Sequence, residues 1–153
     1  MSRICKSGVL MLALVLLFGL AASAEAQAPA GQCTQYVAAK RSLTLYPNAF
    51  QWANGYLASK GYRQVATPVP GAIVVYQPGV NGTNATFGHV ALVESVWGPD
   101  ATGRIWFPIR GANQGPSNVF PYLLYFTDGG YSNVSVRKSS VAPGQWGITF
   151  WVK

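Results

Sequence analysis

The sequence has 153 residues, of which 50% are hydrophobic, 13% aromatic and 10% charged, and its formal net charge is +7. A chain of this length is typical of one domain. Its aromatic content excludes an intrinsically disordered protein, which has too little apolar surface to offset the entropy lost on ordering. The small share of charged residues excludes a coiled coil.

The first segment has the three parts of a secretory signal peptide. Arg3 and Lys6 give it a positive start, residues 9–20 are apolar, and small residues follow as far as Ala26. The apolar run is shorter than the roughly 18 residues that a membrane span needs. We therefore expect a Sec-type signal peptide over residues 1–26 and a single mature domain over residues 27–153. The mature protein is expected to be secreted or periplasmic, with no stable membrane insertion after cleavage.

The mature chain is basic and has few metal-binding side chains. Removal of residues 1–26 leaves nine Lys and Arg and three Asp and Glu, a net charge of +6. This charge suits an anionic partner such as a cell-wall polymer or a membrane surface. The basic residues are scattered rather than gathered in a stripe, which argues against a nucleic-acid partner. Cys33 and His89 are the only cysteine and histidine that remain, too few to hold zinc, so we expect no metal and no cofactor.

Two helices and then several strands are expected along the mature chain. The first helix covers residues 33–41. The second begins after Asn48, a good N-cap, and ends at Gly61, because glycine suits the left-handed conformation that stops a helix. The strand-like segments are residues 72–76, 88–97, 104–109, 119–126, 132–137 and 147–152. Helices first and strands after indicate an α+β fold.

Cys33 stands where a loop enters the first predicted helix. A helix N-terminus favours a thiolate, but only by about 0.3–1 kcal/mol, whereas one pKa unit corresponds to about 1.4 kcal/mol. The helix alone therefore moves the pKa of this thiol by less than one unit. A strong nucleophile needs a second group, and His89 is the one imidazole that the chain offers.

His89 begins a predicted strand, directly after Gly88, whose missing side chain allows close approach to the ring. Because side chains alternate along a strand, Glu94 lies on the opposite face from His89. Glu94 is therefore a poorly directed candidate for the group that orients the imidazole, although it remains one alternative.

The hairpin that follows His89 supplies a second alternative. If Trp97 pairs with Arg104, His89 lies opposite Ala112, and a one-residue bulge would bring Asn113 beside the ring. Asn113 could then accept a hydrogen bond from one ring N–H, as the third residue does in Cys-His-Asn sites.

Each of the two central residues also has an ordinary structural explanation. A single buried cysteine is usually an inert small apolar residue, and a single histidine is usually part of a surface or core hydrogen-bond network. Together they are more informative, because a thiol at a helix start and an imidazole at a strand start form a nucleophile and its base.

Three segments resemble one family in order and in spacing. They are residues 31–38 (GQCTQYVA), 70–76 (PGAIVVY) and 88–96 (GHVALVESV), and they resemble the CHAP family, the cysteine, histidine-dependent amidohydrolases/peptidases. The resemblance implies a papain-like α+β fold in which N-terminal helices pack on an antiparallel β-sheet. It implies cleavage of amide bonds in peptidoglycan, with Cys33 as the nucleophile and His89 as the general base.

The sequence departs from this family at two positions. Gln35 stands where an aromatic residue is common, and Gly111 stands where many members have a glutamate two residues before an asparagine. Only Asn113 is matched on that strand, so the third residue is either Asn113 or Glu94. We expect residues 114–153, which match no motif, to pack in the core or to line the substrate groove.

The predicted function is an exported peptidoglycan hydrolase, either an N-acetylmuramoyl-L-alanine amidase or an endopeptidase. The Cys33 backbone N–H and the Gln32 side chain are expected to stabilise the oxyanion. One alternative is a non-catalytic cell-wall-binding protein. Another is an antibacterial toxin with the same amidase chemistry, whose partner would be an immunity protein.

Overall fold

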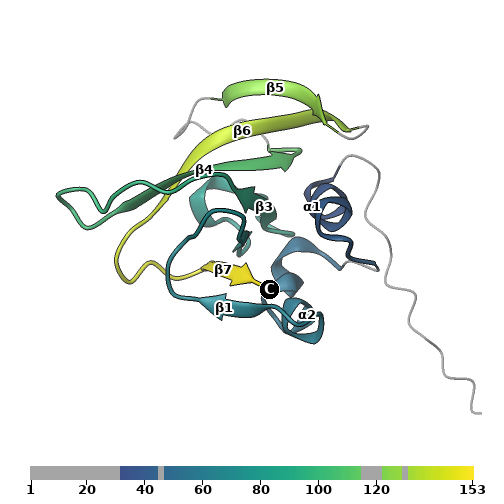
Figure 1. Ribbon diagram of the computed structural model, residues 1–153, viewed down its shortest axis with the longest axis horizontal. Helices are drawn as coiled ribbons and strands as arrows, with labels where there is room; N and C mark the ends of the chain where they lie inside the picture. Colours follow the sequence, from purple (N-terminus) through teal and green to yellow (C-terminus); the bar gives the residue numbers. More distant parts are fainter. Residues whose placement is uncertain (1–31, 45–46, 115–121, 129–130) are drawn as a thin grey trace, which may run out of the picture.

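The computed structural model describes residues 32–44, 47–114, 122–128 and 131–153, and Figure 1 shows their arrangement. The predicted signal peptide lies outside the described residues. Within this part of the chain, no helix has both the length and the hydropathy that crossing a membrane requires.

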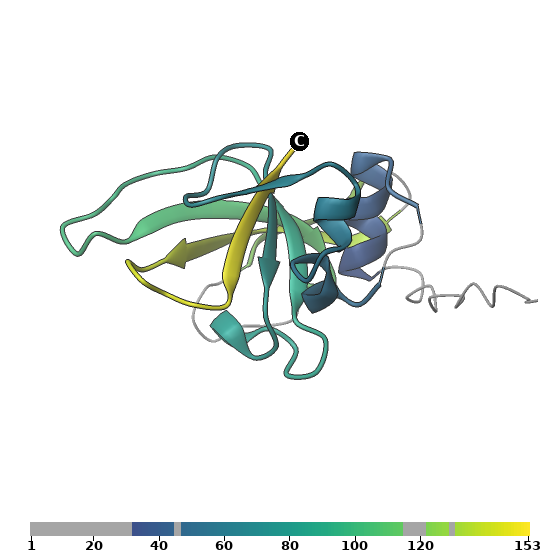
Figure 2. The same cartoon turned by 90° about the horizontal axis from the view of Figure 1, so that it is seen from below.

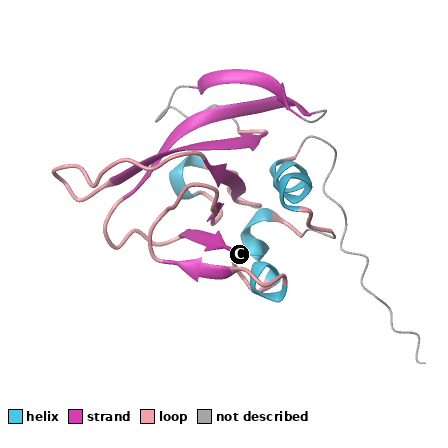
Figure 3. Cartoon of the chain, in the orientation of Figure 1, coloured by secondary structure: helices cyan, strands magenta, loops and turns pink. Residues whose placement is uncertain are grey.

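An antiparallel sheet of seven strands, in the order β1-β7-β2-β3-β4-β6-β5, forms the body of the described chain. Short helices lie beside it, as the colouring of Figure 3 shows. The strands are β1 (Arg63–Val65), β2 (Ile73–Tyr76), β3 (His89–Val93), β4 (Ile105–Ala112), β5 (Tyr122–Asp128), β6 (Tyr131–Val141) and β7 (Ile148–Val152). The helices are α1 (Cys33–Arg41), α2 (Tyr56–Ser59) and the 3-10 helices η1 (Ala49–Trp52) and η2 (Val80–Gly82). The predicted α+β architecture is confirmed.

The helices cover one face of the sheet. Helix α1 packs on β3 and β4, while η1 packs on β2 and β3, and Figure 2 shows α1 and α2 gathered on the same side. Tyr36 of α1, Trp52 of η1 and Leu57 of α2 are fully buried there against Val75 and Val90 of the sheet. This helix-facing core fixes where the start of α1 lies relative to the start of β3.

A second apolar core occupies the other face of the sheet. It includes Val74, Val93, Phe107 and Phe150, and the rings of Phe107 and Phe150 meet edge to face, 5.3 Å apart. Because both faces are covered, every residue of β2 and β3 is buried. These strands therefore read as continuous apolar runs rather than as alternating patterns.

Helix α1 begins and ends at the predicted residues, and Ser42 follows it in the left-handed conformation. The prediction of one helix between Asn48 and Gly61 is wrong. Asn48 does open a helix, and its backbone N–H donates to the Gln51 side chain at 3.0 Å. Gly55, with φ 107°, then separates η1 from α2. A residue at positive φ cannot continue a right-handed helix.

The strands follow the predicted segments, with one correction of register. Trp97 pairs with Trp106 rather than with Arg104. The regular ladder between β3 and β4 is Leu92↔Arg110 and Val93↔Ile109, which leaves one extra residue between positions 93 and 97 on the β3 side. We attribute this extra residue to Pro108. Its backbone O accepts a hydrogen bond from the Glu94 N–H at 2.9 Å, but proline has no N–H with which to form the second hydrogen bond of the pair.

Two further elements differ from the expectation. Strand β1 is absent from the predicted elements, because its exposed residues Arg63 and Gln64 show no apolar alternation. The segment after residue 114 supplies β5, β6 and β7; residues 119–121 of the predicted strand 119–126 lie outside the described residues. Strand β7 is paired between β1 and β2 in the interior of the sheet, as expected of a core-packing segment.

Gly88, just before β3, gives the first testable prediction. It has φ +67°, and a Cβ there would lie 2.2 Å from the backbone O of Tyr76. The glycine therefore allows β2 to pack against the chain entering β3, a different role from the close approach to the His89 ring that the sequence suggested.

We expect Gly88→Ala to lower the free energy of unfolding by roughly 1–3 kcal/mol more than Gly61→Ala does. Gly61 is the matched control, because it also has positive φ, +80°, but a Cβ at that position would have nothing within 4 Å. Both variants carry the same backbone strain of about 1–2 kcal/mol. The difference between their free energies of unfolding, measured with urea, is therefore the cost of the steric clash alone. Equal losses in the two variants would contradict this explanation.

Candidate active site

Cys33 is the first residue of α1 and a free thiol that is 9% exposed. Burial raises the pKa of this thiol, and hydrogen bonds from the backbone N–H groups of Val90, Thr34 and Cys33 itself oppose that effect. Burial is the larger influence, so the resting group at neutral pH is the thiol rather than the thiolate. The hydrogen bond from Val90 also places the sulfur beside β3, one residue after His89.

His89 is the first residue of β3, directly opposite Tyr76 of β2. Its side chain is 8% exposed. Burial, followed by the positive charge of Arg137, lowers the pKa of the imidazole to about 4. The ring is therefore neutral at neutral pH and able to accept a proton. Its Nε2 atom is buried and has no hydrogen-bond partner among the described residues.

One cavity of about 330 Å³ brings the predicted residues together. It lies where α1 and β3 begin and β4 ends, and four residues predicted from the sequence line it: Gln32, Cys33, His89 and Asn113. Two basic residues of β6, Arg137 and Lys138, are also among the lining residues, although the Lys138 ammonium itself lies over the Trp106 ring, 4.4 Å from its centroid. Glu94, the alternative third residue, is not among the lining residues.

Asn113 follows β4 with φ 51°, and its Nδ2 donates to Oε1 of Gln32 at 2.9 Å. This bond leaves the Nε2 of Gln32 as a donor for another group. When the β3–β4 ladder is continued from Leu92↔Arg110, Asn113 is level with His89 without the bulge that the sequence suggested at this point. Whether Asn113 orients the imidazole stays a prediction, since its described bond is to Gln32.

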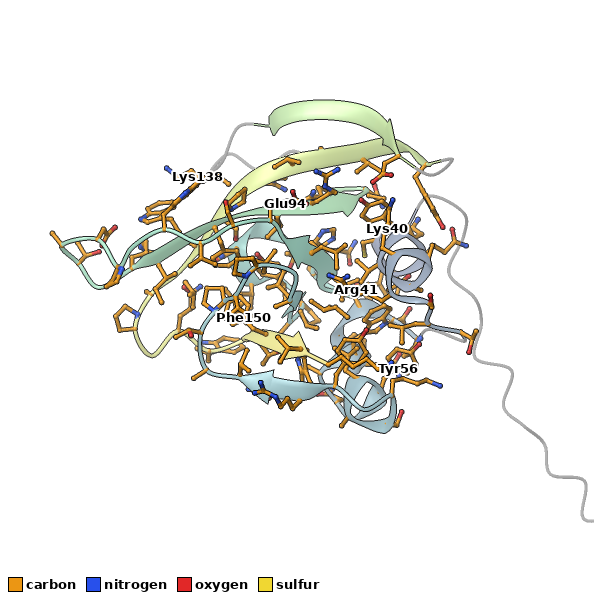
Figure 4. All side chains as sticks on the ribbon, in the orientation of Figure 1. Lys40, Arg41, Tyr56, Glu94, Lys138 and Phe150 are labelled. Atoms are coloured by element: carbon orange, nitrogen blue, oxygen red, sulfur yellow. The ribbon has the colours of Figure 1, made fainter. Side chains whose placement is uncertain are left out.

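Glu94 is held on the surface by Arg110. The guanidinium donates to both carboxylate oxygens, at 2.5 and 3.1 Å. Arg110 also lies 3.8 Å from Asp128, which accepts from Tyr36 at 2.7 Å and from Lys40 at 2.5 Å. This network, with Lys40 and Glu94 labelled in Figure 4, links α1 to the sheet. The carboxylate of Glu94 thus has a structural partner and does not reach the cavity.

Several cavity residues could not be found from the sequence. Tyr76 and Ser139 are bonded to one another through their hydroxyl groups at 2.6 Å, and Arg137 and Gln114 also line the cavity. Tyr76 ends the PGAIVVY segment, but Arg137, Gln114 and Ser139 belong to no motif. Arg137 and Ser139 reach the site only because β6 pairs with β4, and the same pairing brings Ser135 of β6 to the Gln114 amide. No local pattern reveals such a long-range pairing.

The described residues contain no group of three or more His, Cys, Asp or Glu side chains placed to hold a metal ion. The chemistry available in this cavity is that of a thiol, an imidazole and amide donors. Such a set can carry out nucleophilic attack on a carbonyl carbon with proton transfer to and from the imidazole.

Comparison with known families agrees with this arrangement. The family model of the CHAP domain matches residues 23–107, which include Cys33 and His89. This chain belongs to the CHAP family. The resemblance carried by its three sequence segments is confirmed.

A solved structure supports the same fold. The chain is similar to an N-acetylmuramoyl-L-alanine amidase from Staphylococcus aureus, with 25% sequence identity and a TM-score of 0.50. The similarity covers 80% of this chain and 30% of the amidase, so this CHAP chain spans about a third of that protein's length. No curated protein matches the sequence.

The buried imidazole of this CHAP domain makes its stability depend on pH. The pKa of His89 is about 4 in the folded chain and near its ordinary 6.5 when unfolded, so between these values the unfolded chain binds a proton that the folded chain does not. The free energy of unfolding should therefore fall as the pH is lowered through this window, by roughly 3 kcal/mol.

His89→Gln should remove this part of the dependence. The measurement is urea unfolding of both proteins between pH 7 and pH 4. Asp100 and Asp128 have lowered pKa values in the folded chain, so their contribution to the free energy of unfolding is lost mainly below this pH window. That contribution is the same in the wild type and in the variant. The same slope in the wild type and in the variant would show that His89 is not buried in its neutral form.

Proposed function

We propose that this chain is a peptidoglycan hydrolase that cleaves amide bonds of cell-wall peptides, with Cys33 as the nucleophile and His89 as the base. The observation that carries the proposal is that these two residues, the only cysteine and histidine after residue 26, line one cavity. Membership in the CHAP family and the similarity to a staphylococcal amidase support the substrate class.

The proposed reaction starts from two neutral groups. When an amide enters the cavity, His89 takes the proton from the Cys33 sulfur, and the thiolate attacks the carbonyl carbon. The carbonyl oxygen becomes negative and accepts hydrogen bonds from the Cys33 backbone N–H and the Nε2 of Gln32. Asn113 supports this step because it binds the other end of the Gln32 amide.

Collapse of this intermediate completes the first half of the reaction. Protonated His89 gives its proton to the leaving amine, the C–N bond breaks, and the acyl group stays on Cys33 as a thioester. Water then attacks the thioester with His89 again as the base. The products are a carboxylic acid and the regenerated Cys33 thiol.

The charge of the cavity suits an acidic peptide. The charge of Arg137 acts on His89 in the cavity, and among the described residues that line the cavity none is acidic. Carboxylate groups of a cell-wall peptide would be attracted to this wall of the site. The net charge of +6 over residues 27–153 acts in the same direction at longer range.

Export is part of the proposal and rests on the N-terminal pattern. A Sec-type signal peptide over residues 1–26 would deliver the domain to the periplasm or the medium, where peptidoglycan lies. The same chemistry would serve remodelling of the cell's own wall or a toxin that is paired with an immunity protein. The bond that is cut, between muramic acid and the stem peptide or within the peptides, is decided by the products.

The first test is digestion of purified peptidoglycan with residues 27–153 and with the Cys33→Ala variant. We expect the variant to lose activity by about 10³-fold or more, because no other thiol can take over as the nucleophile. Mass spectrometry of the products distinguishes an amidase, which releases free stem peptides, from an endopeptidase, which shortens stems or cuts cross-bridges. Wall binding without release by either protein would favour the non-catalytic alternative and contradict the proposal.

A second test concerns the cationic wall. Arg137→Gln should raise the KM for an acidic stem peptide by roughly ten-fold, the loss of one charged hydrogen bond. It should also raise the pKa of His89, whose value the Arg137 charge lowers, so that the acid limb of kcat/KM moves to higher pH. Arg63→Gln on the distant strand β1 is the control for net charge. If both variants gave the same KM and pH profile, the cavity arginine would have no special role.

A further inference from the structure

Gln114 is a buried side chain with one end fixed and the other end unused. It is 3% exposed, and its Nε2 donates to the backbone O of Ser135 at 2.5 Å and of Gly111 at 3.1 Å. Carbonyl oxygens only accept hydrogen bonds, so these bonds determine which end of the amide is nitrogen. The Oε1 atom is therefore directed away from them, and it has no hydrogen-bond partner among the described residues although it is buried.

The side chain of Gln114 lies over Gly111, on the face of the sheet that carries His89. A Cβ at Gly111 would be 3.2 Å from the Cβ of Ala91 and 3.4 Å from the Cγ and Cδ of Gln114. Ala91 and His89 are two residues apart on β3 and so share a face. Gln114 thus fills the space that a side chain at position 111 would take, and it lines the same cavity as His89.

The unused atoms of Gln114 and His89 are complementary. A neutral imidazole that accepts a proton on one nitrogen carries a hydrogen on the other. A buried N–H without an acceptor costs free energy, as does a buried carbonyl without a donor. The Nε2 of His89 and the Oε1 of Gln114 are both buried, and neither has a partner in the described chain.

We infer that Gln114 is the positioning residue of His89: its Oε1 accepts from the Nε2–H of the ring across one water molecule, since no direct bond joins the two atoms. This bond holds the tautomer in which Nδ1 is free to take the proton from Cys33. The inference rests on the proposed function and goes further, because it assigns separate tasks to two neighbouring amides. Asn113 holds Gln32 for the oxyanion, and Gln114 holds the imidazole.

The chain is well suited to a direct test, since His89 is its only histidine. In the protein with ¹⁵N-labelled histidine, NMR of the single ring gives its tautomer. We expect the Nε2–H form in the wild type and a mixture of both tautomers in Gln114→Met, which keeps the volume but has no acceptor. The variant should lose kcat by roughly 10- to 100-fold with little change in KM.

Val134→Ala separates this role from simple packing. Val134 is fully buried on β6 opposite Ala112, so its truncation weakens the same strand pair without touching either polar group. It should lower the free energy of unfolding but leave the tautomer and kcat unchanged. If Val134→Ala changed kcat and tautomer as much as Gln114→Met, the effect would be structural and the inference would be overturned.

A third variant serves if Gln114→Met does not fold. Gln114→Glu would place a carboxylate near the ring and so raise the pKa of His89. The positive charge of Arg137 on β6 acts in the opposite direction and is the same in both proteins. The other groups near the ring, the thiol of Cys33 on α1 and the hydroxyl of Tyr76 on β2, are not altered by the substitution. An unmoved pKa would contradict contact between the two groups. An Nδ1–H tautomer in the wild type would also overturn the inference.

Failure of this inference can be told apart from failure of the proposed function. If Cys33→Ala abolishes hydrolysis while Gln114→Met changes neither the tautomer nor kcat, Gln114 has no positioning role and the hydrolase function stands. If the wild type hydrolyses no peptidoglycan but its tautomer responds to Gln114→Met as expected, the contact stands and the proposed function fails.

Discussion

The packing of helix α1 on β3 joins the start of the helix to the start of the strand, and across this junction the backbone N–H of Val90 acts to lower the pKa of the Cys33 thiol. The site depends on this junction, because Cys33 comes from the helix and His89 from the residue before Val90. The apolar contacts of Tyr36 and Trp52 beneath the helices hold the junction from one side. The ion pairs of Asp128 hold the helix from the other.

Burial gives the two central groups their resting state. It raises the pKa of Cys33 and lowers that of His89, so both are neutral before a substrate arrives. A helix N-terminus contributes too little to reverse the desolvation of a buried thiol. In the proposed mechanism, charge therefore forms only during the reaction, next to amide donors that are already oriented, and the side chains of Gln32, Asn113 and Gln114 supply that orientation.

Local sequence predicted the parts of this site that depend on local physics. Helix α1 could be placed at its correct ends, and the apolar runs of β2 and β3 gave both the strands and the position of His89. The break at Gly55 and the changed register after Val93 could not be predicted, since they follow from backbone conformation and from the missing N–H of Pro108. The positions of Gln114 and Arg137 depend on the pairing of β6 with β4, which brings together residues far apart in the chain.

The central claim, that Cys33 is the nucleophile, is tested most directly by the mass of the peptide that contains Cys33, taken from protein that is turning over substrate. The domain is mixed with peptidoglycan fragments, quenched in acid and digested, and the Cys33 peptide is examined by mass spectrometry. The account predicts that this peptide carries the acyl half of the substrate as a thioester, which no peptide of Cys33→Ala does. Cleavage products from a wild-type protein whose Cys33 stays unmodified, together with equal activity of Cys33→Ala, would contradict it.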